Sequence, residues 1–164
     1  MSRLGLVLLL TLGPASAWAQ LPPSLVGAWR LVSFTRADAT GADRPVWDDR
    51  PSGLIIYTAD GHMAAQLYDA RRPPLGVPRE RAAPDAVRTA FAGLTTYFGT
   101  YTLDQPVGTV THTVEGAMLP DWIGAKLVRA YRFLGPDRVE LRVVTDAAGQ
   151  RVADGAVLVW ERAR

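Results

Sequence analysis

Between Trp29 and Arg162 the sequence repeats one pattern, in which short segments rich in β-branched and aromatic residues are separated by turn-forming residues. Short strands at regular spacing are typical of an all-β chain. The turn at Ala59-Asp60-Gly61 predicts a hairpin, because Gly61 can adopt the positive φ that such turns need. A polar loop is expected over residues 40–52. The sequence thus predicts eight strands, over residues 29–36, 54–58, 62–68, 96–103, 109–115, 125–134, 138–145 and 156–162.

One short helix is predicted between the third and fourth of these strands, over residues 84–94. Pro84 suits the first turn of a helix, where its missing N–H has no intrahelical partner. Four apolar residues then recur at helical spacing and define one face of the helix. They are Val87, Ala90, Phe91 and Leu94.

Eight antiparallel strands in about 140 residues favour a closed barrel, because closure removes the exposed edges of a sheet. A sandwich of two sheets is the alternative architecture. An eight-stranded barrel is either filled by its own side chains or wide enough to hold one small ligand. The fold alone therefore leaves both a binding protein and a filled barrel open.

The first residues have the order of a secretory signal peptide. Arg3 supplies a positive charge, residues 4–12 form an uncharged apolar run, and Ala17-Trp18-Ala19 provides small residues for a peptidase. The apolar run is too short to span a bilayer. We expect residues 1–19 to be cleaved, which leaves residues 20–164 as a single domain in the periplasm or outside the cell. No membrane-spanning segment follows.

Composition excludes several classes of partner and chemistry. The formal net charge is +2 and no basic run stands out, so nucleic acid is not an expected partner. The chain has no cysteine and only two histidines, so we expect neither a disulfide nor a dedicated metal site. No phosphate-binding loop or serine-nucleophile motif is present, and no cofactor is expected. No pattern indicates an oligomeric state.

Several stretches of the sequence, in order, resemble the lipocalin-like domain family of bacteria and fungi, which is of the calycin type. The first is residues 25–33, where Gly27 and Trp29 match the G-x-W opening strand. The others are residues 53–58, 60–61, 63–66, 97–101, 108–112, 114–115 and 120–124, then Arg129 with Tyr131, and residues 158–162. The resemblance spans nearly all of residues 20–164. It implies a barrel that binds a small apolar or amphipathic molecule, but it does not fix a reaction.

The resemblance also implies roles for particular residues. In such barrels the tryptophan of the first strand lies at the closed end, against an arginine of the last strand, which gives Trp29 and Arg162 a structural role. At Thr113 the sequence departs from the family, where a second histidine beside His112 is expected. Chemistry that needs paired histidines is therefore not predicted.

Arg129 is the unusual residue of an otherwise apolar strand face that also carries Leu127, Tyr131 and Phe133. A buried charge needs a partner. That partner is predicted to be Glu115, in a structural ion pair, and the carboxylate of a bound ligand is the alternative. His112 alternates with Val110 and Val114, so it is predicted to be a core residue or else a general acid–base.

Three hypotheses for function follow. The first is a carrier or sequestering protein for a small hydrophobic or amphipathic molecule, with polar anchors Arg129 and His112. The second is an isomerase or cyclase in which His112 is the catalytic acid–base. The third is a filled barrel that acts through its surface. The cavity walls expected for the first hypothesis are Ile56, Met63, Leu67, Tyr97, Tyr101, Tyr131 and Phe133.

We predict that the mature protein begins at or near Gln20, because the positive, apolar and small-residue segments precede it in the order that a signal peptidase recognises. N-terminal sequencing of protein from a periplasmic extract of its own host would show this start. A chain in that fraction that still begins at Met1 would contradict the prediction.

Overall fold

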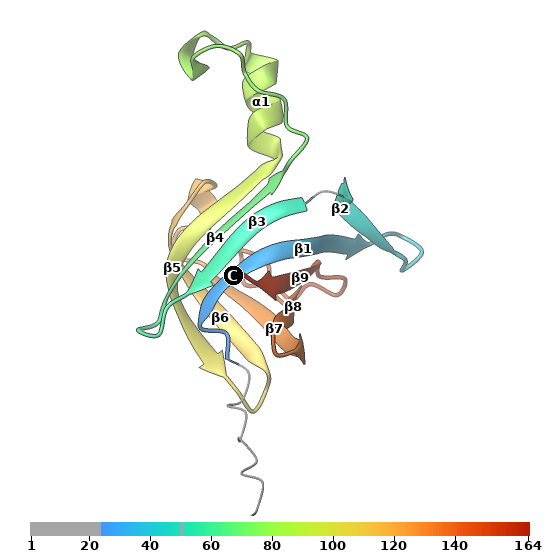
Figure 1. Ribbon diagram of the computed structural model, residues 1–164, viewed down its shortest axis with the longest axis vertical. Coiled ribbons are helices and arrows are strands. Elements are labelled where there is room, and N and C mark those ends of the chain that lie inside the picture. The colour runs from blue at the N-terminus through green and yellow to red at the C-terminus, as the bar shows by residue number, and fades with distance from the viewer. Residues whose placement is uncertain (1–23, 50) are drawn as a thin grey trace, which may run out of the picture.

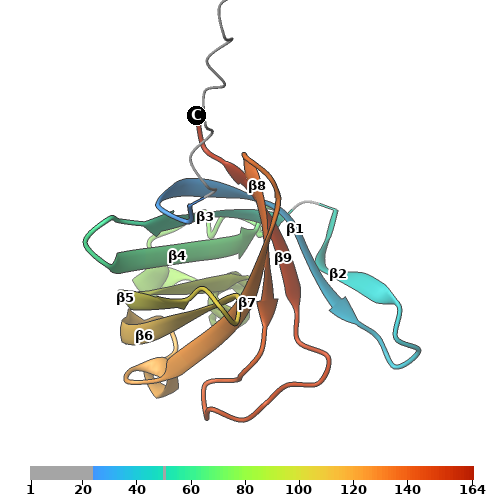
Figure 2. The same cartoon turned by 90° about the horizontal axis from the view of Figure 1, so that it is seen from below.

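The computed structural model describes residues 24–49 and 51–164. The predicted signal peptide lies outside these residues. Nine strands form one antiparallel sheet in the order β2-β1-β3-β4-β5-β6-β7-β8-β9, and β1 also pairs with β9. Figures 1 and 2 show β9 beside β1, where the sheet closes on itself. The strands are β1 (Gly27–Ala37), β2 (Asp43–Asp49), β3 (Pro51–Tyr57), β4 (His62–Asp69), β5 (Leu94–Asp104), β6 (Thr109–Ala117), β7 (Lys126–Gly135), β8 (Arg138–Val143) and β9 (Val157–Arg162).

Eight of the strands form the predicted closed barrel. The ninth, β2, was not predicted and lies beside β1 outside the closed ring. The segment predicted as a polar loop over residues 40–52 contains this strand, which pairs with the end of β1 through only three residue pairs. Its residues are mostly polar and exposed, so they carry no alternation that marks a strand. Trp47 holds it in place by packing edge-on against Phe34 of β1, with ring centroids 5.0 Å apart. The extra strand places the helix between β4 and β5, not between the third and fourth strands.

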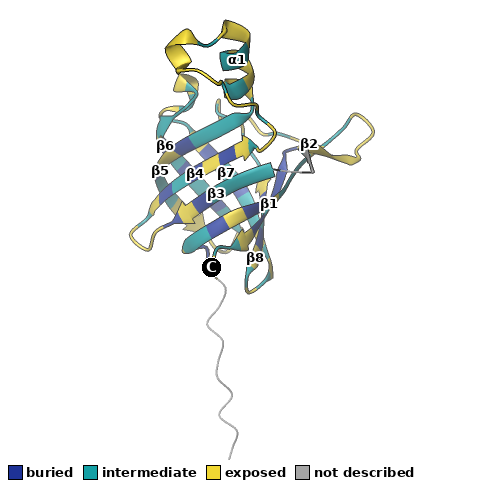
Figure 3. Ribbon diagram, turned by 45° about the horizontal axis from the view of Figure 1, so that its top comes forward, coloured by how far each residue is buried: buried dark blue, intermediate teal, exposed yellow. Residues whose placement is uncertain are grey.

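Alternation along most of the strands separates the interior of the barrel from its surface (Figure 3). In β3, Ile55 and Tyr57 are buried whereas Ile56 between them is exposed. In β7, Leu127 and Arg129 are buried, and Arg132 and Leu134 are exposed. The hydrophobic core is therefore the inner face of the barrel, to which every strand except β2 contributes.

The helix α1 (Pro84–Ala92) projects beyond the ends of β4 and β5 and stands apart from the barrel (Figure 1). It ends earlier than predicted, since Gly93 follows it and Leu94 begins β5. None of its residues is buried, and Phe91 is half exposed. The apolar face predicted for this helix thus does not pack on the core. Within the described residues, no helix is long and apolar enough to cross a membrane.

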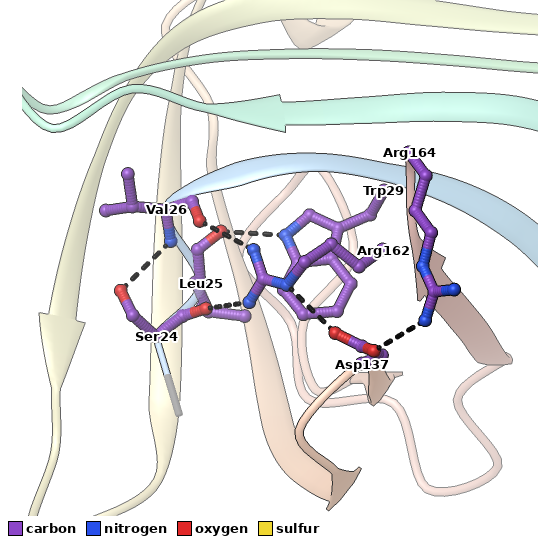
Figure 4. Close-up of polar contacts among 7 residues, drawn as sticks. All are labelled: Ser24, Leu25, Val26, Trp29, Asp137, Arg162 and Arg164. Carbon is purple, nitrogen blue, oxygen red and sulfur yellow. Dashed lines mark hydrogen bonds and ion pairs between the residues drawn. The ribbon is translucent and has the colours of Figure 1, made fainter. Parts of the chain in front are cut away.

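Trp29 and Arg162 close one end of the barrel (Figure 4). They are register partners in β1 and β9, and the guanidinium carbon of Arg162 lies 4.1 Å from the Trp29 ring centroid. The Trp29 indole donates to the carbonyl of Leu25 at 2.8 Å. The Arg162 guanidinium donates to the carbonyls of Ser24 and Val26, each at 3.0 Å. The contact expected between first and last strand is formed, and it also ties down the segment that leads into β1.

Gly27 is required beside this contact for two reasons. Its φ of +125° lies in the region that favours glycine. A Cβ atom at this position would also lie 2.8 Å from Nη1 of Arg162. The glycine and the tryptophan of the G-x-W pattern therefore both contribute to the contact with Arg162. The tryptophan supplies the indole, and the glycine leaves room for the arginine that covers it.

We predict that Trp29→Ala and Arg162→Ala together cost less stability than the sum of their separate effects, because each variant removes the same contact. Trp29→Ala alone should cost about 3–5 kcal/mol, as is typical of a buried tryptophan. Urea unfolding of the two single variants and the double variant measures the coupling. Arg88→Ala, on the exposed helix α1, is the control that should be additive with Trp29→Ala. Strict additivity for Arg162→Ala would contradict the contact.

Candidate functional site

The barrel contains a cavity of about 670 Å³. It lies toward the end opposite Trp29 and Arg162, where the long connections between β4 and β5, β6 and β7, and β8 and β9 meet. Exposed residues of the β8–β9 connection, including Asp146 and Asp154, line it together with Arg36 of β1. Deeper, the wall is mainly apolar. Its aliphatic part includes Ile55, Ala65, Leu67, Leu127, Leu141 and Leu158. The side chains of the barrel therefore do not fill its interior.

The residues predicted to form the site separate into three groups. Four of them line the cavity, namely Leu67, Tyr97, His112 and Arg129. Four others point into the barrel without lining the cavity, and they pack toward the closed end. These are Met63, Tyr101, Tyr131 and Phe133. Phe133 contacts Trp29 with ring centroids 6.4 Å apart, so this group forms the floor beneath the cavity.

Ile56 is placed differently from the prediction. It is 36% exposed on the outer face of β3, whereas its neighbour Ile55 lines the cavity. Since side chains alternate across a strand, choosing the wrong one of two adjacent isoleucines reverses the face. Ile55 is therefore the wall residue of this strand.

His112 is held by two tyrosines across the barrel. Its Nε2 lies 2.8 Å from the hydroxyl of Tyr57 in β3, and its Nδ1 lies 3.0 Å from the hydroxyl of Tyr97 in β5. The ring is 1% exposed. Burial, with a smaller contribution from the positive charge of Arg129, lowers the pKa of His112 to about 3, so the imidazole is neutral at physiological pH. Both ring nitrogens of His112 are therefore engaged by tyrosine hydroxyls.

Arg129 does not form the predicted ion pair with Glu115. The guanidinium of Arg129 points inward and is 9% exposed, and its Nη1 donates to the carbonyls of Val128 and Thr145 at 3.0 and 3.3 Å. Glu115 is exposed on the outer face of β6, where it is the extra residue of a bulge opposite Phe98 and Gly99. Because Glu115 directly follows the inward-facing Val114, its side chain lies on the outer face and does not approach Arg129. Among the described residues, Arg129 has no carboxylate partner.

The family comparison agrees with this architecture. Residues 26–163 match the lipocalin-like domain. The chain belongs to the lipocalin-like domain family. Among solved structures, this lipocalin-like barrel is similar to a redesigned β-barrel, with 12% identity, a TM-score of 0.41, and 85% of this chain and 92% of that one covered. It is also similar to a de novo designed fluorescence-activating β-barrel, with 13% identity, a TM-score of 0.40, and 84% and 93% covered. No curated protein matches the sequence.

Three aromatic residues of this lipocalin-like site are absent from the predicted set. Tyr57 was included only in residues 53–58, one of the stretches that resemble the family, and was given no role in the site. Its contact with His112 joins residues that are 55 positions apart in the sequence. Trp122 lies in a short 3-10 helix, η2 (Pro120–Trp122), and packs edge-on against Tyr97 at 5.7 Å. Trp160 was included only in the predicted strand over residues 156–162. It lines the cavity, and its buried Nε1 has no hydrogen-bond partner within the described residues. Alternation with Leu158 in β9 is the pattern that could have indicated Trp160.

We predict that the neutral His112 makes the fold acid-sensitive. Because the folded pKa is about 3 and the unfolded one about 6.5, the unfolded chain binds an extra proton below pH 6.5. Stability should therefore fall as pH decreases, by up to about 1.4 kcal/mol per pH unit below pH 6.5. Urea unfolding at pH 7, 6 and 5 tests this.

The two histidines of the described chain supply a matched control. His112→Gln should flatten the pH dependence between pH 7 and 5, whatever its effect on stability at pH 7. His62→Gln, at an exposed position of β4, should retain the dependence of the original chain. Equal slopes in all three proteins would show that His112 is not held neutral.

Proposed function

We propose that the mature lipocalin-like protein is exported and binds one small hydrophobic or amphipathic molecule inside its barrel, as a carrier or sequestering protein. The cavity supports the binding part of this proposal. Its volume of about 670 Å³ lies within the range of small-molecule sites, roughly 300–1,000 Å³. Such sites combine a mainly apolar wall with a few placed polar groups, and here those groups are Arg129, Tyr97 and His112.

Export is supported by the order of the N-terminal residues. A barrel without disulfides must hold through its own core and closure. The buried inner faces and the β1–β9 pairing provide that stability without a redox requirement. We therefore propose the periplasm as the compartment in which the protein holds its ligand.

Two adjacent alanines of β4 allow a matched test. Ala65 lines the cavity and is buried, whereas Ala64 lies on the opposite face of the same strand. Ala65→Phe should place a ring in the cavity and weaken binding of the apolar fluorescent probe N-phenyl-1-naphthylamine by tenfold or more, since it removes ligand volume. Ala64→Phe should leave binding unchanged.

Fluorescence titration measures both affinities, and thermal melts show that each variant folds. Mass spectrometry of the probe recovered afterwards should show it unchanged, as a carrier requires. Equal affinity in both variants would mean that the probe binds outside the barrel, and it would contradict the proposal.

A further inference from the structure

The polar groups that face the cavity include a buried positive charge, which a site for a neutral apolar ligand does not need. Arg129 brings a full positive charge into the deeper part of the wall, which is mainly aliphatic and aromatic, whereas the other charged lining residues, Arg36, Asp146 and Asp154, are exposed. Its two hydrogen bonds both come from Nη1 and both end on backbone carbonyls. No described residue takes a hydrogen bond from its Nε or Nη2. A buried charge without a counter-charge is costly, and an anion in the cavity would remove that cost.

The second polar group is the Tyr97 hydroxyl, and its role depends on the tautomer of His112. A neutral imidazole has one N–H and one acceptor nitrogen, so one tyrosine donates to the ring and the other accepts from it. If Tyr97 donated to Nδ1, then Tyr57 would accept from Nε2–H and its own hydroxyl proton would need another acceptor. Tyr57 is 1% exposed, and its hydroxyl has no described partner other than His112.

The opposite arrangement satisfies the Tyr57 hydroxyl and moves the free proton to Tyr97. Tyr57 donates to Nε2, Nδ1–H donates to the oxygen of Tyr97, and the hydroxyl proton of Tyr97 remains free. Since Tyr97 lines the cavity and Tyr57 does not, a group bound in the cavity can accept this proton, whereas none can reach Tyr57. An unsatisfied buried hydroxyl is unfavourable, so this second tautomer is the preferred one.

Arg129 and Tyr97 present their donors to the same place. The positive charge of Arg129 acts on the Tyr97 hydroxyl, where it partly offsets the burial that raises the pKa of this tyrosine. The third member, His112, is neutral and uses its only N–H on Tyr97. The inner part of the cavity therefore offers donors and one positive charge. The acidic residues Asp146 and Asp154 are exposed on the β8–β9 connection.

We infer that the ligand is a singly charged organic anion, a carboxylate on an apolar body, with its carboxylate bound by Arg129 and the Tyr97 hydroxyl. This inference rests on the proposed function and specifies its ligand class. One arginine balances one negative charge, which favours a carboxylate over a doubly charged phosphate ester. The apolar body then packs against the aliphatic wall, including Leu67 and Leu141.

Decanoate and decanamide test the inference, because they share one chain and one head-group shape and differ in charge. Each displaces N-phenyl-1-naphthylamine from the full mature chain at pH 7.5. The original protein should bind decanoate at least about tenfold more tightly than decanamide, as expected for hydrogen bonds to a charged group. Arg129→Leu should abolish this preference while changing the affinity for decanamide by less than about threefold.

Arg36→Leu is the control, because Arg36 also lines the cavity but is exposed at the end of β1. It should retain the preference for decanoate. Arg129→Leu leaves no carboxylate unpaired among the described residues, so we expect it to fold. Should it fail to fold, Tyr97→Phe removes only the hydroxyl and should reduce the preference for decanoate by about tenfold or more.

The outcomes separate the inference from the proposed function. Equal binding of acid and amide by the original protein, or a preference that survives in Arg129→Leu and Tyr97→Phe, would overturn the inference and leave a neutral-ligand site standing. Loss of the preference in Arg36→Leu alone would place the head group at the mouth and would also overturn it. Failure of the probe and both compounds to bind would contradict the proposed function itself.

Discussion

The pairing of the first strand with the last is the interaction on which the rest of this structure depends. It turns a nine-stranded sheet into a barrel and gives eight strands a common interior. At one end of this seam, Arg162 covers the indole of Trp29 and hydrogen-bonds the chain that leads into β1. That end is closed by a cation–π contact and backbone carbonyls, with Asp137 as a partly exposed counter-charge 3.6 Å from Arg162. The cavity therefore lies toward the other end, where the long connections are.

Closure also sets the electrostatics of the interior. Among the described basic residues, His112 and Arg129 are buried inside the barrel, and burial affects their charges differently. His112 gives up its charge and is fixed by Tyr57 and Tyr97 through both ring nitrogens. Arg129 cannot lose its proton, so it keeps the charge and uses two backbone carbonyls. The result is an interior that is apolar in area, positive in charge and rich in donors, which is the chemistry that favours an amphipathic carboxylate.

Much of the fold followed from short-range pattern, because alternation and turn residues act over a few positions. The eight barrel strands, the hairpin at Gly61 and the inward face of Leu127 and Arg129 were all predictable in this way. Strand β2 was not, since its polar residues are held by a hairpin and by Trp47 rather than by a buried face. The predicted contact between Arg129 and Glu115 was wrong. Alternation places Arg129 on the inner face of β7, and the same rule places Glu115, next to the buried Val114, on the outer face of β6. The hydrogen-bond partners of His112 are brought to it by closure of the barrel, from strands distant in the sequence. No local sequence pattern predicts such contacts.

The central claim is that a buried arginine and a tyrosine hydroxyl receive the charged head of the ligand inside the barrel. A crystal structure of the mature chain in complex with decanoate tests it most directly. The account predicts carboxylate oxygens about 2.7–3.2 Å from a guanidinium nitrogen of Arg129 and from the Tyr97 hydroxyl, with the alkyl chain along Leu67 and Leu141. A carboxylate bound at Arg36, or a decanoate bound outside the barrel, would contradict it.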